Sequence, residues 1–405
     1  MPATNCLIVG GGQTAVSAAA KLREFDSAAA ITIVSAEKVL PYQRPPLSKA
    51  YLSGELPLER LYLRPADWYD EHRIDVKLAT QAVSIDRAKK TVLLDSGDSL
   101  PFDKLLLATG SVPRRLPDEM VENLEGVFTL RESIDSDAIR PFLKEGNRLV
   151  VIGGGYVGLE AAAIARKLGL SVTVLEIAER ILHRVASRET SDYFRDLHIR
   201  NGVDIRESSG FRYFERIGRK LTSVNSSNGE ALLADVALVG IGVVPNEEIA
   251  RQAGLNVGNG ITVDEFCRTS DPAIFAAGDC ASFPFKGSMV RLESVPHAIH
   301  HAESAAENML GGSAPYIATP WFWSDQYDVK LQIAGLNLGY NATAVRLGKR
   351  EGAQSVWYYR DDELIAVDAM NDAPSFMIAR RIIEAGKSVP KEVVADLSIN
   401  LKEWV

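Results

Sequence analysis

Two stretches of the sequence carry glycines whose spacing suits the binding of a phosphate group. In the first, the apolar run NCLIV leads into Gly10, Gly12 and Ala15, and an alanine-rich helical pattern follows. Glycines at such positions permit a tight turn and a close backbone approach, so a pyrophosphate can bind the N–H groups at the helix start. The sequence therefore predicts a dinucleotide-binding fold that begins near residue 5.

The second stretch, RLVVIGGGYVGLEAAAIARKL, repeats the strand, the turn and the helix with Gly153, Gly155 and Gly158. The two stretches align without a gap, which pairs Gly12 with Gly155 and Ala15 with Gly158. This repetition predicts a second dinucleotide-binding fold that begins near residue 148.

Each fold of this kind needs an acid after its second strand, where a carboxylate accepts hydrogen bonds from ribose hydroxyls. In the second fold this acid is Glu176, at the end of LSVTVLE. A carboxylate there repels a 2′-phosphate, and the nearest arginine is Arg180, so we expect NAD(H) rather than NADP(H). In the first fold the acid is Glu37, which follows its strand after two small residues. A solvated loop charge is the alternative for Glu37.

Two further stretches indicate which nucleotide binds where. FDKLLLATGSVPRR is a buried strand pattern followed by Thr109 and Gly110, and IFAAGDC places Gly278 and Asp279 at the end of a short apolar strand. An aspartate in that place can hydrogen-bond the ribitol and the pyrophosphate of a flavin. Taken singly, each stretch also fits an ordinary strand and turn.

The elements that position these residues belong to a chain of 405 residues, for which two or three domains are expected. The formal net charge of -8 gives no support to binding of nucleic acid or anionic membranes. No apolar run approaches the roughly 18 residues of a membrane span, and the chain opens almost directly into its first strand, so we expect a cytoplasmic location. Cys6, Cys267 and Cys280 are too scattered for a disulfide framework or a metal site.

Taken together, the motifs resemble those of a known family. GGGQTA, PPLSK, LLLATGS, GGGYVGLE, ALVGIGVVPN and IFAAGDC, in this order, are similar to segments of two-dinucleotide flavoprotein reductases. LPYQRPPLSKAYLSG, RLESVPHAIHHA and PWFWSDQYDVKLQIAG resemble one branch, the putidaredoxin reductase-like, NADH-dependent ferredoxin reductases of monooxygenase and aromatic-ring dioxygenase systems. The resemblance covers nearly the whole chain, and it implies FAD and NADH as cofactors.

The family resemblance implies an α/β, glutathione-reductase-like architecture of two Rossmann-like domains and a C-terminal α+β domain. Residues 1–111 and 245–325 are expected to form the FAD-binding domain, residues 112–244 the NAD-binding domain, and residues 326–405 the C-terminal domain. VKLQIAG, SVWYYR and ELIAVDAM are predicted strands of the last, because they are rich in β-branched and aromatic residues.

The proline-rich stretch PYQRPPLSK carries the residue of greatest chemical interest. Disulfide reductases of the superfamily place redox-active cysteines in this region, but this chain has none from Val34 to Tyr62. Thiol chemistry is therefore disfavoured, and electrons from NADH are expected to leave the flavin for a docked one-electron partner. The resemblance implies that this partner is a two-iron two-sulfur ferredoxin.

Lys49 ends this stretch, and the resemblance pairs it with Glu160. Small apolar residues surround Glu160 in GLEAAAIA, where a carboxylate is costly unless it is paired. In the resembled family the corresponding lysine and glutamate meet beside the flavin, which implies that Lys49 and Glu160 are catalytic. The alternative is a solvated lysine and an acid favoured by the helix dipole.

The resemblance also implies further cofactor contacts, while Ser294 is predicted to cap a helix whose start faces the flavin. For FAD the implied contacts are Arg44, Val83, Arg131, Val295 and Trp323. For NAD(H) they are Tyr156, Val157, Gly242 and Glu293. Arg44 equally fits a surface charge, and core packing explains both Trp323 and its neighbour Trp321.

We expect no metal site, because His297, His300 and His301 lack a carboxylate or cysteine at ligand spacing and fit the surface of a helix. An acidic ferredoxin that binds transiently would need a basic surface. The candidate residues for that surface are Arg64, Arg291, Arg346, Lys349 and Arg350. No nucleic acid or membrane is expected as a partner, and the protein is expected to be a monomer or weak dimer.

The sequence leaves two other functions open. One is an NADH oxidase or a reductase of a small acceptor, which the missing cysteine disfavours. The other is an apoptosis-inducing-factor-like protein, in which NADH controls protein contacts and turnover is incidental.

Overall fold

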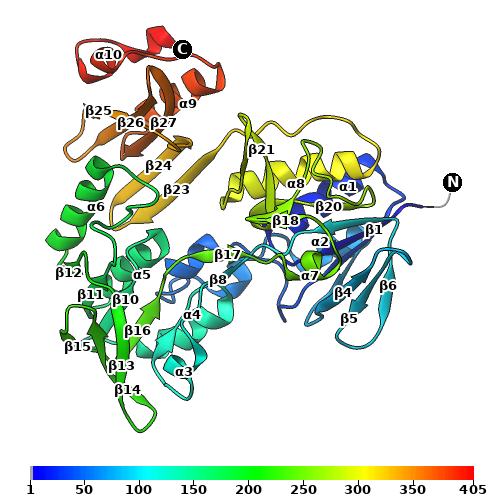
Figure 1. The fold of residues 1–405 in the computed structure, drawn as a ribbon, viewed down its shortest axis with the longest axis horizontal. Helices are drawn as coiled ribbons and strands as arrows, with labels where there is room; N and C mark the ends of the chain where they lie inside the picture. Colours follow the sequence, from blue (N-terminus) through cyan, green and yellow to red (C-terminus); the bar gives the residue numbers. More distant parts are fainter. Residues whose placement is uncertain (1–2) are drawn as a thin grey trace. The chain divides into compact units, whose positions relative to one another are not determined.

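The computed structural model describes residues 3–405, and the chain divides by its internal contacts into two units (Figure 1). Unit 1 holds the chain up to Gln43 together with Glu59–Val112 and Val243–Ala318. Unit 2 holds Arg44–Leu58, Pro113–Gly242 and Thr319–Val405.

Unit 1 is built on a five-stranded parallel sheet with the order β20-β7-β1-β2-β3. Nearly all residues of the central strand are buried, as expected for a parallel strand covered on both faces. Helix α1 packs against α8. The elements of this layer are β1 (Asn5–Val9), α1 (Gln13–Phe25), β2 (Ala30–Val34), α2 (Ala66–Glu71), β3 (Ile74–Lys77), β7 (Lys104–Leu107), β20 (Ile274–Ala276) and α8 (Val295–Met309).

Besides the pair β17-β8, unit 1 contains a three-stranded and a four-stranded sheet. One is the antiparallel sheet β4-β5-β6 and the other is β18-β19-β21-β22. Their elements and the short connections are β4 (Ala82–Asp86), β5 (Thr91–Leu94), β6 (Ser99–Pro101), β8 (Ser111–Pro113), β17 (Val243–Pro245), α7 (Glu248–Gln252), β18 (Val257–Gly258), β19 (Gly260–Thr262), β21 (Ala281–Phe285) and β22 (Ser288–Val290).

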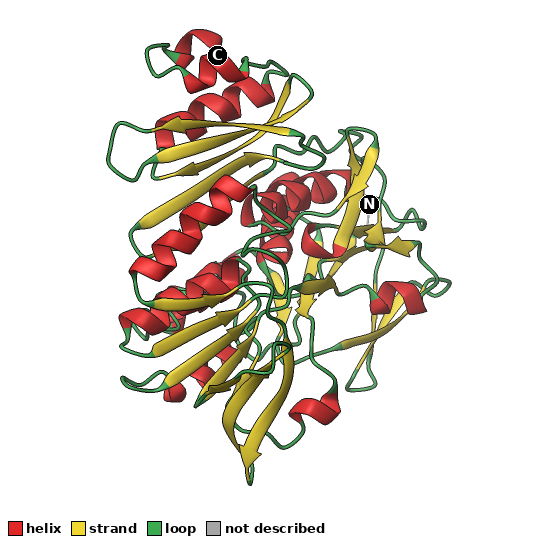
Figure 2. Cartoon of the chain, turned by 60° about the vertical axis from the view of Figure 1, so that its left-hand side comes forward, coloured by secondary structure: helices red, strands yellow, loops and turns green. Residues whose placement is uncertain are grey.

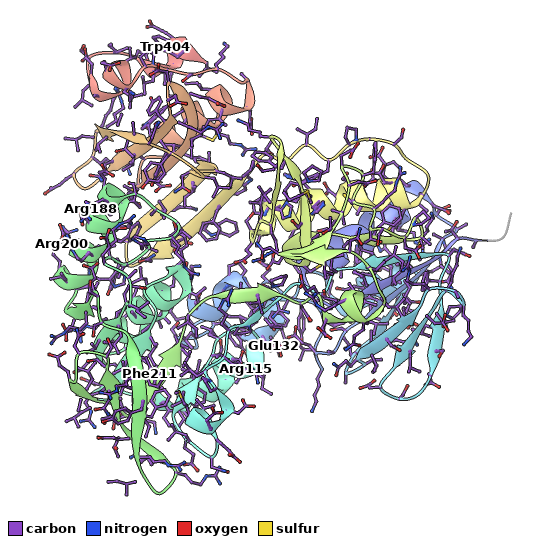
Figure 3. The ribbon with its side chains drawn as sticks, viewed as in Figure 1. Arg115, Glu132, Arg188, Arg200, Phe211 and Trp404 are labelled. Carbon is purple, nitrogen blue, oxygen red and sulfur yellow. The ribbon has the colours of Figure 1, made fainter. Side chains whose placement is uncertain are left out.

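Unit 2 repeats the same parallel topology, with the order β12-β11-β10-β16-β9. In both sheets the strand that leads into the glycine turn is central, as the repeated motif predicts. Arg188 and Arg200, labelled in Figure 3, are the first and last residues of α6. The elements are α3 (Asp118–Val121), β9 (Val127–Phe128), α4 (Ser133–Ile139), β10 (Arg148–Ile152), α5 (Tyr156–Lys167), β11 (Ser171–Leu175), α6 (Arg188–Arg200), β12 (Val203–Arg206), β13 (Phe211–Ile217), β14 (Lys220–Ser226), β15 (Ala231–Leu233) and β16 (Val236–Val239).

The segment Arg44–Leu58 lies early in the chain but packs within unit 2. Its first turn is a 3₁₀ helix, η1 (Pro45–Ser48), in which proline occupies the first position, where no N–H is needed. The Ser136 hydroxyl of α4 donates to Leu47 O at 2.8 Å, and Tyr51 donates to Asp137 at 2.9 Å. The proline-rich stretch is thereby fixed on the second dinucleotide-binding fold.

The C-terminal part of unit 2 is a five-stranded antiparallel sheet with the order β23-β24-β27-β26-β25, and α9 covers one of its faces (Figure 2). Alternate residues of β26 serve opposite faces, as the strand period requires. Trp357 and Tyr359 face α9, whereas Val356 and Tyr358 join the core of the second dinucleotide fold. The elements are β23 (Trp321–Gln326), β24 (Val329–Gly335), β25 (Ala342–Leu347), β26 (Gln354–Arg360), β27 (Glu363–Met370), α9 (Ala373–Glu384) and α10 (Lys391–Ala395).

The α/β class and the predicted C-terminal strands are confirmed. The contact division groups most of the predicted NAD-binding domain with the C-terminal domain, and the three-domain division itself stays a prediction. Residues 1 and 2 of the predicted first domain lie outside the described residues. Within residues 3–405, no helix has both the length and the apolar character that crossing a bilayer requires.

Candidate cofactor and redox site

The first glycine turn in unit 1 has the geometry of a phosphate-binding turn. Gly10 has φ +130°, and a Cβ built there would lie 2.1 Å from Ala108 O. A Cβ on Gly12 would meet nothing within 4 Å, and no side chain caps α1 at this residue. Glycine is therefore required by packing at Gly10, whereas Gly12 borders open space at the start of the helix, which suits a pyrophosphate.

A second turn of unit 1 lies beside this helix. Gly278 has φ +76°, and a Cβ there would lie 2.2 Å from Thr14 Oγ1. Asp279 accepts a hydrogen bond from the Ser111 hydroxyl at 3.1 Å. The Thr109 hydroxyl donates to Asn246 O at 2.5 Å, which ties the strand end at Thr109 and Gly110 to the chain where it re-enters unit 1.

The glycine turn of unit 2 repeats the first. A Cβ on Gly153 would lie 2.4 Å from Gly240 O, and one on Gly158 would lie 2.5 Å from Gly153 O. At Gly155, the helix N-cap, a Cβ would again meet nothing within 4 Å and no side chain supplies a cap. The predicted spacing thus produces the same open helix start in both units.

Glu176 follows directly after β11, at the predicted place. Its two carboxylate oxygens accept hydrogen bonds of 2.8 Å from the backbone N–H groups of Gly154 and Ala178. Arg180 is buried and donates to Ala186 O and Ser191 Oγ. The guanidinium of Arg180 is therefore committed to its own loop, which is unfavourable for binding a 2′-phosphate.

One residue beside this turn was missed by sequence reasoning. A Cβ built on Gly242, where φ is +103°, would lie 3.1 Å from Arg184 Nη2. The exposed Arg184 therefore brings a positive charge to the backbone that was predicted to approach NAD. Its sequence context, in ILHRVAS, carries no signal that separates it from other surface arginines.

Lys49 and Glu160 meet within unit 2. The distance from Lys49 Nζ to Glu160 Oε1 is 2.9 Å, and their side chains are 19% and 5% exposed. Glu160 Oε2 accepts from the Ser48 hydroxyl at 2.5 Å, and Oε1 also accepts from the Ser324 hydroxyl at 2.6 Å. The alternative of a solvated lysine is wrong, because the carboxylate of Glu160 is buried and paired.

The cysteines offer no reactive thiolate. All three are buried, and burial raises the pKa of Cys6 and of Cys267 to about 12. Burial also raises the pKa of Cys280. Thiols in such surroundings stay protonated and are poor nucleophiles.

The other predicted cofactor residues are distributed over both units. Arg44 Nη1 donates to Arg131 O at 2.8 Å in unit 2. In unit 1, Val83 on β4 is 45% exposed, and Val295 is the first residue of α8, which the Ser294 hydroxyl caps by accepting from His297 N.

Several of these residues lie along α5 and β23. Tyr156 and Val157 begin α5; the Tyr156 ring lies 5.1 Å from that of Phe322, and Val157 is 47% exposed. Trp323 and Trp321 share one face of β23, with ring centroids 5.6 Å apart. By strand alternation this face is opposite to the one that holds Ser324.

The expectation that the three histidines lie on a helix surface is wrong for two of them. His297 and His301 are buried, because they form an aromatic cluster with Phe283 and Tyr316. Burial lowers the pKa of His297 to about 4, and His301 Nδ1 accepts a hydrogen bond from Gly278 N. Among residues 3–405, no three His, Cys, Asp or Glu side chains gather as a metal site would need.

Two of the five basic residues predicted to bind a ferredoxin instead make contacts within the protein. The Arg291 side chain is 9% exposed and pairs with Glu293 at 2.7 Å. Arg346 donates to backbone carbonyls of Val394, Asp396 and Ile399. Arg64, Lys349 and Arg350 are exposed, which leaves these three as candidates.

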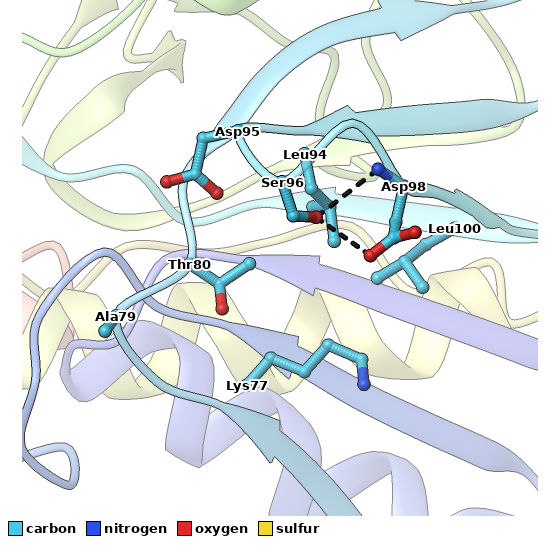
Figure 4. Close-up of a pocket in the computed structure, with 8 residues that line it drawn as sticks. All are labelled: Lys77, Ala79, Thr80, Leu94, Asp95, Ser96, Asp98 and Leu100. Atoms are coloured by element: carbon cyan, nitrogen blue, oxygen red, sulfur yellow. Dashed lines mark hydrogen bonds between the residues drawn. The ribbon is translucent and has the colours of Figure 1, made fainter.

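A surface pocket in unit 1 lies apart from the predicted residues. It is bordered by the end of β3 and by the β5–β6 hairpin, with Lys77, Asp95 and Asp98 among its lining residues (Figure 4). None of the predicted cofactor contacts lines it.

Comparison with known proteins identifies the family. The pyridine nucleotide-disulphide oxidoreductase model matches residues 4–302, and the reductase C-terminal model matches residues 321–405. The chain belongs to the pyridine nucleotide-disulphide oxidoreductase family. The predicted family resemblance is therefore confirmed.

Individual members of the family match along nearly their whole length. Rhodocoxin reductase of Rhodococcus erythropolis is 41% identical over 98% of this chain and 93% of its own. Putidaredoxin reductase of Pseudomonas putida is 41% identical over 99% of this chain and 96% of its own. A solved covalent putidaredoxin reductase–putidaredoxin complex matches with a TM-score of 0.95 and 40% identity, covering 99% of this chain and 98% of that one.

This pyridine nucleotide-disulphide oxidoreductase has FAD and NAD(H) as its cofactors, as predicted. The two glycine turns fit them, because each presents an uncapped helix start to open space at Gly12 and at Gly155. The family name refers to disulphides, but this member has no reactive thiol, because all three of its cysteines are buried.

Proposed function

We propose that the protein is an NADH-dependent ferredoxin reductase, in which a hydride passes from NADH to FAD and single electrons pass on to a two-iron two-sulfur ferredoxin of a monooxygenase or dioxygenase system. The observation that carries this proposal is the ion pair of Lys49 with the buried carboxylate of Glu160, in a family member without an accessible thiol. FAD, when bound, accepts a hydride as two electrons and can give them up singly.

Lys49 and Glu160 are the proposed catalytic pair. A lysine held at 2.9 Å from a buried carboxylate keeps one orientation and a fixed local field, and so needs little reorganisation during hydride transfer. The prolines of η1 support this role, because they restrict the backbone directly before Lys49.

The proposed electron donor is NADH. The Glu176 carboxylate lies next to the open helix start at Gly155, where it would repel the 2′-phosphate of NADPH. Arg180 is buried in its own loop and is not positioned to offset that repulsion.

The proposed partner docks transiently on basic side chains, for which Arg64, Lys349 and Arg350 are the exposed candidates. Such an association weakens as salt screens the charges. A monomeric or weakly dimeric state and a cytoplasmic location belong to the same proposal.

An anaerobic stopped-flow experiment tests the function in two steps. NADH is mixed with the FAD-loaded protein, and a two-iron two-sulfur ferredoxin is added once flavin absorbance has bleached. Rapid bleaching by NADH followed by rapid reduction of the ferredoxin is expected. A stable reduced complex that does not pass electrons to any ferredoxin would contradict the proposal and favour an NADH-responsive binding protein.

A further inference from the structure

A series of hydrogen bonds, most of them buried, runs from the Glu160 carboxylate through β23 to His198 on α6. The Ser324 hydroxyl donates to Glu160 Oε1 at 2.6 Å, and Gln326 Nε2 donates to Ser324 Oγ at 3.2 Å. Gln326 Oε1 lies 2.8 Å from His198 Nε2, and His198 Nδ1 lies 3.3 Å from the Tyr327 hydroxyl. All of these residues belong to unit 2.

All members except the half-buried Tyr327 are shielded from water. Ser324, Gln326 and His198 are 0% exposed, and Glu160 is 4% exposed. Ser324 and Gln326 lie on the same face of β23 because they are two residues apart, and this face also carries Phe322, which contacts Tyr156 of α5. Hydrogen bonds in such surroundings are stronger than in water and polarise one another.

The direction of every bond in the chain follows from the charge of Glu160. An ionised carboxylate only accepts, so Ser324 must donate its one proton to it. Gln326 must then offer its NH₂ group to Ser324, which turns its carbonyl towards His198. His198 therefore carries its proton on Nε2, and Nδ1 is left to accept from Tyr327. Burial lowers the pKa of His198 to about 4, which agrees with a neutral ring holding one proton.

We propose that Ser324, Gln326 and His198 are positioning residues that hold Glu160 ionised, so that Lys49 keeps its partner through the catalytic cycle. All donors in this series of hydrogen bonds point towards the Glu160 carboxylate, and each stabilises its negative form. The inference rests on the proposed role of the Lys49–Glu160 pair, and it assigns β23 and α6 a part in the redox site.

The groups around Glu160 are few. Of the elements packed on α5, η1 brings Lys49 and Ser48, and β23 brings Ser324. Tyr156 on α5 itself also interacts with Glu160 electrostatically, and burial raises the Tyr156 pKa. Removal of the Ser324 hydroxyl therefore takes away one of the two hydroxyl donors to the carboxylate.

The test measures the protonation of Glu160 directly in FAD-loaded protein without NADH or ferredoxin. Infrared spectra of protein labelled with ¹³C-glutamate are recorded against pH, and the Glu160→Gln variant identifies the band. In Ser324→Ala the ionised-carboxylate band of Glu160 is expected to be lost at a proton concentration about tenfold lower than in the unmodified protein, because one hydrogen-bond donor to the carboxylate is gone. Gln326→Met, which keeps the Ser324 hydroxyl, is expected to give a smaller shift.

Ser355→Ala is the matched control, because Ser355 is equally buried on β26 and accepts a bond from Trp357 without joining the chain. In Ser355→Ala the Glu160 band is expected to depend on pH in the same way as in the unmodified protein. An unshifted band in folded Ser324→Ala or, should that variant not fold, in folded Gln326→Met would overturn the inference. The pH profile of flavin reduction by NADH is recorded in parallel, and its acid limb is expected to move together with the infrared band. A shifted band in protein that NADH does not reduce would refute the proposed function and leave the positioning role intact.

Discussion

Lys49 Nζ lies 2.9 Å from Glu160 Oε1, although the two residues come from segments that are far apart in the chain. The contact exists because the segment Arg44–Leu58 packs within unit 2, against the helix that bears Glu160. The pairing predicted for the proline-rich stretch is thus present in the structure, and its proposed role in catalysis can be measured.

Replacing Lys49 by Met is expected to slow anaerobic flavin reduction by NADH about tenfold or more, because the proposed site of hydride transfer loses a fixed positive charge. Stopped-flow absorbance measures the rate. Lys167→Met is the control, since Lys167 also forms an ion pair within unit 2, with Glu55, but its side chain is 61% exposed. Equal rates in the Lys49→Met variant and the unmodified protein would contradict the catalytic role.

Substitution by alanine is expected to have different effects at Gly155, which borders open space, and at Gly153, which is tightly packed. Gly155→Ala should fold, because φ is -82° and a Cβ there meets nothing, yet the methyl group would enter the space proposed for the pyrophosphate. Calorimetry is expected to show NAD⁺ affinity lowered on the order of tenfold with an unchanged melting temperature. Gly153→Ala should instead lose stability, because its Cβ would lie 2.4 Å from Gly240 O. Undiminished NAD⁺ binding by Gly155→Ala would count against the site.

Replacing Glu176 by Gln is expected to reduce the preference for NADH over NADPH by about tenfold, since the charge that repels a 2′-phosphate is removed. The ratio of kcat/KM values for the two nucleotides measures this change. Glu179→Gln is the matched control, because Glu179 lies in the same loop with its side chain 59% exposed. A ratio that is the same in Glu176→Gln and in Glu179→Gln would rule out the proposed discrimination.

A buried carboxyl group predicts how stability depends on pH. Burial raises the pKa of Asp368 to about 7, although the hydroxyls of Tyr358 and Thr190 donate to it. The folded protein therefore retains a proton that the unfolded chain releases near its ordinary pKa of 3.8. The contribution of Asp368 to the free energy of unfolding is complete below pH 3.8 and is lost as the pH rises through about 7.

The Asp368→Asn variant removes this dependence. Between pH 5 and pH 8 the free energy of unfolding of the variant, relative to the unmodified protein, is expected to rise on the order of 2 kcal/mol. Denaturant unfolding at the two pH values measures it, with the exposed Asp362→Asn as control. A constant difference between variant and unmodified protein would show that Asp368 does not titrate in this range.

The parts of the fold that depend on local pattern were predictable from the sequence. The glycine turns, the acid after β11 and the cap at Ser294 follow from spacing alone, and the structure has each at its expected place. The burial of His297 was not predictable, because it depends on a hydrogen bond to Tyr316 that forms only when α8 packs. The pairing of Arg291 with Glu293 and the chain from Glu160 to His198 also require tertiary contacts, for which the local sequence carries no periodic signal.

The chain changes units after Gln43, Leu58, Val112, Gly242 and Ala318. Unit 2 thus combines an early segment of the polypeptide with its last residues, and Leu52 shares one core with Leu331 and Met370. During synthesis on the ribosome, that core cannot close until the C-terminal strands have emerged. The segment that carries Lys49 therefore acquires its complete surroundings only after nearly the whole chain has been made.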